Sequence, residues 1–350
     1  MHKELIYLSF LLMLLASCEE YYTPIIDTVD DHLVVEALIT NDLSKNYVRL
    51  TKTRGFYDKQ APVAVAKAIV QLVEKSGNFV NGTESSTGSF SFKSAPVTGN
   101  NYKLRIYYQN NTYESEMVTM PPLPTILNAY SESKTLTAYN TDAYGKPIAS
   151  SQKGRNIYVD APKTNALAYY RFSTRSTIEW IYAPPGKGGP PPPPLFGWET
   201  FFEKNFNIAA PKTFSQSDTI KMHQLGWLAY DARYYLHSDT LVVSGWVLNV
   251  DQYGTSKGSY DFHEKMNSQF AADGSLFDPI QTQIYGNITC VTDPSIIVFG
   301  YFDLNSYRQY RYYTNLYAQE KDIKLRQIYR YPNIPDKGQI YDWPPEWWEN

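Results

Sequence analysis

A glycine-flanked serine has the spacing of a hydrolase motif. Gly254 and Gly258 enclose Ser256 in a G-x-S-x-G pattern, which in hydrolases places the serine on a tight turn directly after a strand. Here we expect the strand to end before Asp251, so that Asp251–Gly254 lie between it and Ser256. The one histidine after Ser256 is His263, on the next predicted helix and too near in sequence to swing over the serine. We therefore predict that Ser256 is a helix N-cap and not a nucleophile.

Groups that could bind a metal or a cofactor are scattered. Past residue 17 the four histidines share no H-x-x-x-H or H-E-x-x-H spacing: His32, His223, His237 and His263. Asp30, Asp31 and His32 are adjacent, but neighbours on an extended chain point to opposite faces, so we prefer a solvated cluster to a surface calcium site. The sequence contains neither G-x-G-x-x-G nor a Walker loop, and it singles out no carboxylate pair for glycoside hydrolysis. We expect no metal, no cofactor and no catalytic residues.

Tryptophans are the candidate contacts for a ligand or partner. Trp180 and Trp198 flank a proline-rich stretch, residues 184–194, which we expect to be an extended loop between two strands. That loop is either a plain connection or an arm for a partner. Trp343, Trp347 and Trp348 stand near the carboxyl end. They either stack on a sugar or a partner protein, or pack against the folded domain and hold the carboxyl-terminal segment to it.

Arginine and tyrosine alternate over residues 307–313, a pattern also found in single-strand nucleic-acid grooves. The net charge of the chain is −3 and its basic residues are dispersed. We therefore interpret this segment as a strand and expect no nucleic-acid partner.

The amino terminus has the pattern of a lipoprotein signal. An apolar run from Leu5 to Leu15 is too short to cross a bilayer, which takes about 20 residues. It ends in Leu-Ala-Ser before Cys18, the order of a bacterial lipobox, in which the cysteine thiol accepts diacylglycerol. We predict a signal peptide over residues 1–17, an acylated Cys18 and a tether over residues 18–31; an ordinary secretory signal is the alternative. Glu19 and Glu20 resemble a surface-export signal, although a solvated linker explains them as well.

The sequence that carries these residues predicts an all-β fold with one short helix. Apolar and polar residues alternate over Tyr102–Tyr108 and, more loosely, over Ala66–Val73. Some seven strands between residues 32 and 121 predict an immunoglobulin-like or transthyretin-like β-sandwich. The prolines at 121, 122 and 124 suggest a boundary, followed by a larger β domain over residues 122–350. We expect its strands at 156–159, 169–181, 198–202, 225–230, 240–250, 296–302 and 307–313, and a helix at 257–271 in which Phe262, Met266 and Phe270 share a face. Cys290 reads as a small buried residue.

The order of these features resembles the DUF4249 family of Bacteroidota lipoproteins. The lipobox is followed by five short motifs: Leu33–Thr40, Pro62-Val63 with Ala66–Val73, Tyr260-Asp261-Phe262, Gly286-Asn287-Ile288 and Gly300-Tyr301-Phe302. The resemblance implies an outer-membrane lipoprotein whose relatives accompany TonB-dependent transporters, and it brings no catalytic residues. Relatives carry further cysteines near the carboxyl end, whereas no cysteine follows Cys290 in this sequence. The disulfide that the resemblance implies for Cys290 therefore has no partner here.

We therefore expect a lipid-anchored outer-membrane protein, facing the cell exterior, that acts as a non-enzymatic accessory or binding subunit of a TonB-dependent transporter assembly. Two alternatives stay open at this point. One is a surface glycan-binding protein that uses the tryptophans as stacking platforms. The other is a hydrolase with an unrecognised site.

Overall fold

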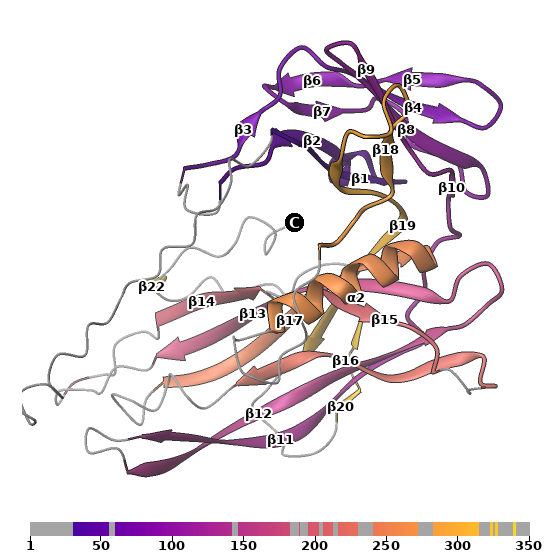
Figure 1. Cartoon of the computed structure of the whole chain (residues 1–350). Coiled ribbons are helices and arrows are strands. Elements are labelled where there is room, and N and C mark those ends of the chain that lie inside the picture. The colour runs from indigo at the N-terminus through magenta and orange to yellow at the C-terminus, as the bar shows by residue number, and fades with distance from the viewer. Residues whose placement is uncertain are drawn as a thin grey trace, which may run out of the picture.

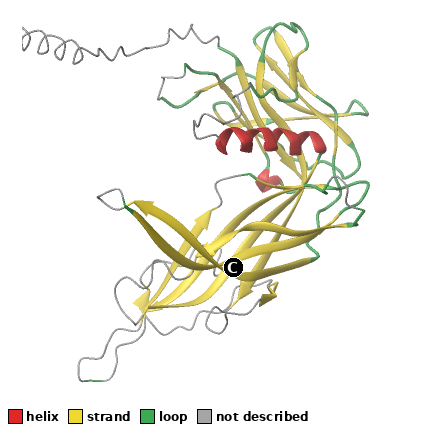
Figure 2. Cartoon of the chain, turned by 60° about the horizontal axis from the view of Figure 1, so that its bottom comes forward, coloured by secondary structure: helices red, strands yellow, loops and turns green. Residues whose placement is uncertain are grey.

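The computed structural model describes residues 31–55, 60–141, 146–182, 189, 195–202, 206–212, 216–229, 241–271, 283–314, 323–324, 326–327 and 339–340. They form three β-sheets and one α-helix, α2 (Lys257–Ala271), so the predicted all-β class with one short helix is confirmed. The sheets enclose two cores, one above the other in Figure 1, and α2 lies between them (Figure 2).

The first core lies between one end of the largest sheet and a six-stranded sheet. The strands of the large sheet at this end are β1 (Leu33–Thr40), β2 (Tyr47–Lys52), β3 (Val63–Ala64), β6 (Thr83–Ser86) and β7 (Ser89–Ser91), with a 3-10 turn η1 (Leu43–Lys45) between β1 and β2. The six-stranded sheet contains β4 (Ile69–Glu74), β5 (Phe79–Asn81), β8 (Asn101–Tyr108), β9 (Asn111–Ser115), β10 (Val118–Thr119) and β18 (Ile288–Cys290). Cys290 is buried in this core, as predicted.

The strand β8 forms where it was predicted because apolar and polar residues alternate along it. Leu104 and Ile106 are buried in the core, while Lys103 and Arg105 on the other face both contact Glu114 of β9. The looser pattern at Ala66–Val73 becomes a strand only from Ile69 onward. The reason is Lys67, which has a φ of 62° and therefore cannot continue a strand.

The second core lies between the other end of the large sheet and a four-stranded sheet. The large sheet contributes β13 (Tyr169–Tyr182), β14 (Leu195–Phe202), β15 (Asn207–Ala209), β17 (Leu241–Thr255), β19 (Val298–Thr314), β21 (Arg326–Gln327) and β22 (Gln339–Ile340). The four-stranded sheet has β11 (Asn128–Thr141), β12 (Pro147–Pro162), β16 (Thr219–Ala229) and β20 (Ile323–Lys324). Phe172, Trp246 and Val159 are among the side chains buried between the two sheets.

One strand, β19, belongs to both cores. Its first half pairs in parallel with β1, from Leu33 opposite Val298 to Thr40 opposite Asn305, and its second half pairs with β17. The prediction of two strands at 296–302 and 307–313 was therefore wrong. Asn305 and Ser306, which resemble turn residues in the sequence, are fully buried in this single strand, because their neighbours in the sheet override local preference.

The predicted division into residues 32–121 and 122–350 stays a prediction, and the structure adds detail to it. Residues of β18 and of the first half of β19 lie in the first core together with the amino-terminal strands. The segment that connects the two cores, residues 121–125, is held in place by side chains of β17 and β19. Ser306 donates to the carbonyl of Pro122 (2.6 Å), and Gln252 donates to that of Thr125 (3.2 Å).

Gly286, just before β18, lies against Gly300 of β19, and Gly300 lies against Val35 of β1. A Cβ at Gly286 would lie 1.5 Å from the carbonyl oxygen of Gly300. Gly300 has a φ of +90°, and a Cβ there would lie 2.0 Å from the carbonyl oxygen of Val35. Asn287 closes the crossing, since its side chain donates to the carbonyl of Phe302 (2.9 Å) and accepts from the amide of Phe302 (2.8 Å). Only glycine fits both positions.

Candidate functional site

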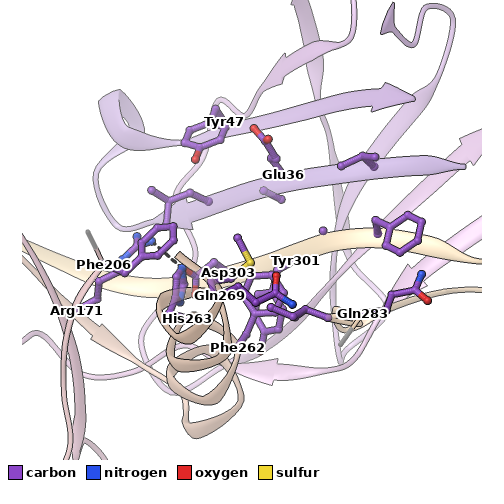
Figure 3. A pocket seen from close by; sticks show the side chains of 17 residues that line it. Glu36, Tyr47, Arg171, Phe206, Phe262, His263, Gln269, Gln283, Tyr301 and Asp303 are labelled. Atoms are coloured by element: carbon purple, nitrogen blue, oxygen red, sulfur yellow. Dashed lines mark hydrogen bonds and ion pairs between the residues drawn. The ribbon is translucent and has the colours of Figure 1, made fainter. Parts of the chain in front are cut away.

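A pocket of about 560 Å³ opens between α2 and the strands β1, β2 and β19 (Figure 3). Glu36 and Tyr47 lie on one side of it, and the helix residues Phe262 and His263 on the other. The side chains that line it are mostly apolar or aromatic, with a few polar groups among them: Val34, Glu36, Leu38, Tyr47, Arg171, Phe206, Phe262, His263, Met266, Gln269, Gln283, Ile284, Phe299, Tyr301 and Asp303.

The periodicity of each element explains why these residues meet. Alternate residues of a strand point to one face, so β1 presents positions 34, 36 and 38, and β19 presents positions 299, 301 and 303. The helix presents positions 262, 263, 266 and 269 from the opposite side. Arg171 comes from β13, directly opposite Tyr253 of β17.

Four polar side chains form a largely buried cluster, and three of them line the pocket: Arg171, His263 and Asp303. Arg171 approaches Asp303, with 3.4 Å between Nη1 and Oδ2, and its Nη1 donates to Nε2 of His263 (3.2 Å). Ser259 donates to Oδ1 of Asp303 (2.6 Å). The guanidinium also lies 4.5 Å from the ring centre of Tyr253, which is a favourable cation–π position. The cluster therefore fixes the orientation of Arg171.

The hydrogen bonds assign the tautomer of His263. Its Nδ1 lies 2.8 Å from the backbone carbonyl of Ser259, so Nδ1 carries the proton, and the bare Nε2 accepts from Arg171. Burial lowers the pKa of His263, and the nearby Arg171 lowers it further against the opposing effect of Asp303. His263 is therefore neutral at pH 7.

This geometry suits binding better than proton transfer. In a Ser-His-Asp site the serine hydroxyl donates to the histidine, whereas here Ser259 donates to Asp303, whose charge Arg171 compensates, and the accepting nitrogen of His263 faces a guanidinium. Ser256 is also committed, because its Oγ accepts from the amide of Ser259 (3.1 Å). The predicted N-cap is confirmed.

One premise of that prediction was wrong. β17 continues to Thr255, so Ser256 directly follows a strand instead of being separated from it by Asp251–Gly254. Tyr253 and Gly254 still pair with Tyr307 and Ser306 of β19. The hydrogen bond from the amide of Ser259 shows the cap, and the absence of a nucleophile stays a prediction.

The predicted face of α2 also differs from the observed one. Phe262 and Met266 line the pocket, Phe270 is 62% exposed, and the buried residues are Ser259 and His263. The ring of Phe262 stacks on Tyr301, with 4.5 Å between the ring centres. The helix thus buries its polar cluster against the sheet and leaves apolar side chains along an open pocket.

Most sequence-predicted site residues lie outside the described part of the chain. This holds for Cys18, Glu19, Glu20, Trp343, Trp347 and Trp348. Trp180 and Trp198 are in the paired strands β13 and β14, where Glu179 is opposite Trp198. The predicted loop over residues 184–194 lies outside the described residues apart from Gly189.

The remaining candidates have structural surroundings. Asp31 pairs with Lys52 (2.8 Å), and the ring of His32 packs edge-on against Phe299. Tyr307, Tyr310 and Tyr312 of the arginine–tyrosine segment are buried, so their rings cannot stack on bases. Among the described residues, no three potential ligands gather as a metal site. Within that same part of the chain, no helix is long and apolar enough to span a membrane.

The sequence did not reveal Arg171, Asp303 and Glu36 as site residues. Each is a charged residue in a strand with an apolar or aromatic residue directly before and after it, and a charge in such surroundings is costly unless it has a partner. That conflict is the one signal available in the sequence, and it does not say which residues pair.

Comparison with known proteins gives one match. A family model described as "Domain of unknown function (DUF4249)" matches residues 19–311. Neither a curated protein nor a solved structure matches the chain.

Proposed function

The chain belongs to the DUF4249 family, and on that premise we propose that it is a non-enzymatic binding protein whose ligand occupies the pocket beside α2. We further propose that an acylated Cys18 anchors it to the outer membrane, facing the cell exterior. There it would act as a binding or accessory subunit of a TonB-dependent transporter assembly.

One observation carries the binding proposal: the pocket combines an apolar lining with an internally neutralised polar cluster. Phe206, Phe262 and Met266 offer apolar surface at its wall, while Arg171 and Asp303 compensate each other's charge. Concave, mostly apolar pockets with a few fixed polar groups are typical of ligand sites. Because Arg171 occupies the accepting nitrogen of His263 and pairs with Asp303, we infer that these groups orient a ligand and do not take a proton from it.

The pocket can be tested with a neutral fluorescent probe, N-phenyl-1-naphthylamine, which brightens in apolar surroundings. Met266 is half-buried and lines the pocket, so Met266→Trp fills part of it. Lys265 is exposed on the same helix and does not line the pocket, which makes Lys265→Trp the matched control. We expect binding to weaken at least tenfold in the first variant and less than twofold in the second. Equal binding by all three proteins would contradict the proposal.

The anchor is tested separately by intact-mass spectrometry of the protein isolated from its native membrane. We expect a polypeptide that begins at Cys18 and carries two or three acyl chains, because a single acyl chain does not anchor a protein stably. A chain that begins elsewhere, or one with an unmodified thiol, would contradict this part. Protease shaving of intact cells then decides which membrane face the protein occupies.

The partner is tested by crosslinking in intact cells followed by purification in mild detergent. Recovery of a TonB-dependent transporter at a stoichiometric level would support the accessory role. Recovery of no membrane-barrel partner would contradict it and leave the pocket unaffected.

A further inference from the structure

We propose that the pocket binds an extended segment of another polypeptide, about four residues long, with apolar side chains and no carboxylate. A backbone carbonyl of that segment accepts hydrogen bonds from Arg171. This inference rests on the proposed binding function and specifies the ligand of the same site.

The shape of the pocket fits an extended chain. On its sheet side the lining runs from Val34 to Leu38 on β1 and from Phe299 to Asp303 on β19. Four residue steps along a strand are about 13 Å at roughly 3.3 Å per residue. Phe262 and His263 of α2 face this sheet side (Figure 3), so the length of the sheet side matches about four extended residues.

Arg171 supplies the specific contact. Its Nη1 is engaged by His263 and Asp303, and among the described residues no acceptor pairs with its Nε or Nη2. Its side chain is 15% exposed and lines the pocket. A guanidinium fixed by an ion pair, a histidine and an aromatic ring has little freedom left to lose, so donating to a ligand oxygen costs it little entropy.

The charges indicate which oxygen Arg171 meets. Asp303 is 5% exposed, and its Oδ2 has only the ion-pair contact with Arg171. Glu36, the other carboxylate of the lining, pairs with Arg49 (3.1 Å). A ligand carboxylate would enter a site whose one guanidinium is already compensated and would repel Asp303. A neutral carbonyl avoids that cost.

The rest of the lining favours a peptide over a sugar or a lipid. Val34, Leu38, Phe262 and Met266 carry no strong hydrogen-bonding group, so the hydroxyl groups of a saccharide that faced them would be buried unpaired. Tyr47, Tyr301, Gln269 and Gln283 can pair with the backbone of a peptide. A free fatty acid would bring the carboxylate that the charges disfavour. Apolar side chains on a neutral backbone satisfy both walls.

The test is displacement of N-phenyl-1-naphthylamine from the full chain by four probes. The first is a library of tetrapeptides, acetylated and amidated, with Leu, Val, Phe or Tyr at every position. The second is the same library with one position fixed as Glu. The others are dodecanoate and maltohexaose. We expect the first library to displace the dye at a concentration at least tenfold lower than any other probe.

The double variant Arg171→Gln/Asp303→Asn tests the carbonyl contact without leaving a lone buried charge. Circular dichroism and the melting temperature report whether it folds. We expect its affinity for the peptide library to fall at least tenfold relative to its affinity for the dye, which carries no carbonyl. An equal loss for both would overturn the role of Arg171.

The outcomes separate this inference from the function beneath it. If dodecanoate or maltohexaose displaces the dye and the peptides do not, the peptide assignment is wrong and the binding function stands. If dye binding is itself insensitive to Met266→Trp, the binding function is wrong as well.

Discussion

At the scale of single residues, His223 shows how burial makes stability depend on pH. Its ring stacks on Phe172, with 5.3 Å between the centroids, and its Nε2 lies 2.6 Å from Oδ1 of Asn207. Burial lowers the pKa of His223 to about 4, from an ordinary value of 6.5. Between these values the unfolded chain binds a proton that the folded chain does not.

The folded state therefore loses stability as the pH falls from 6.5 toward 4, because the unfolded state binds more protons in that window. His263, whose pKa is also lowered by burial, acts in the same direction. We expect His223→Gln to reduce the slope of the free energy of unfolding against pH in this window, by the amount that corresponds to nearly one bound proton. Urea unfolding at pH 7, 6, 5 and 4.5 measures the slope. A variant whose slope equals that of the native chain would contradict the assignment.

Ser256 gives a second prediction at this scale. Its Oγ satisfies the amide of Ser259 in the first turn of α2, and removal of such a cap costs about 1 kcal/mol. We expect Ser256→Ala to lower the free energy of unfolding by about that amount. Ser268 is exposed and lies within the same helix, so Ser268→Ala should change stability by less than about 0.5 kcal/mol. Equal effects would argue against the cap.

At the scale of elements, the crossing of Gly286 and Gly300 connects the β18 segment to β19 and β1. A methyl group at either position would overlap backbone atoms, and backbone cannot move aside as a flexible side chain can. We expect Gly286→Ala and Gly300→Ala each to cost more than about 3 kcal/mol. Gly55 has open space around its Cβ position and no positive φ, so Gly55→Ala is the control. Near-native melting of either crossing variant would contradict the steric argument.

How far the sequence predicts an element depends on whether one face is buried along its whole length. β8 buries one face, and β13 buries alternate residues from Tyr170 to Ile178; both were found close to their observed bounds, whereas β17 runs to Thr255, five residues past its predicted end at 250. β11 was missed because Ser133–Thr137 is exposed at every position, which leaves no alternation to detect. β19 was split in two because Asn305 and Ser306 are buried through long-range partners that local sequence does not show.

The site was harder to predict than the elements, for a related reason. Arg171 and Asp303 are 132 positions apart and meet only because β13, β17 and β19 are consecutive in one sheet. Pairing order across a sheet is set by tertiary packing, and no spacing rule in a single sequence encodes it. The N-cap at Ser256 was predictable because it depends on neighbours three residues away.

At the scale of the whole molecule, the two cores share one sheet. Phe302 and Leu304 of β19 belong to the first core, and Tyr310 and Tyr312 of the same strand belong to the second. We expect residues 32–121 expressed alone to lack a stable fold, since β18 and half of β19 would be missing from their core. Nuclear magnetic resonance spectra of that fragment measure this. A dispersed spectrum with cooperative unfolding would show an independent domain instead.

The parallel pairing of β1 with β19 also determines the order in which the molecule can be assembled. Leu33 and Val298 are 265 positions apart, so β1 leaves the ribosome long before its neighbour exists. Until the last sixth of the chain has been made, an apolar strand keeps one hydrogen-bonding edge open to any other strand that it meets. Fragments that end before residue 298 should therefore bind holdase chaperones and fail to form the pocket, whereas fragments that extend past residue 314 should fold and leave these chaperones unbound.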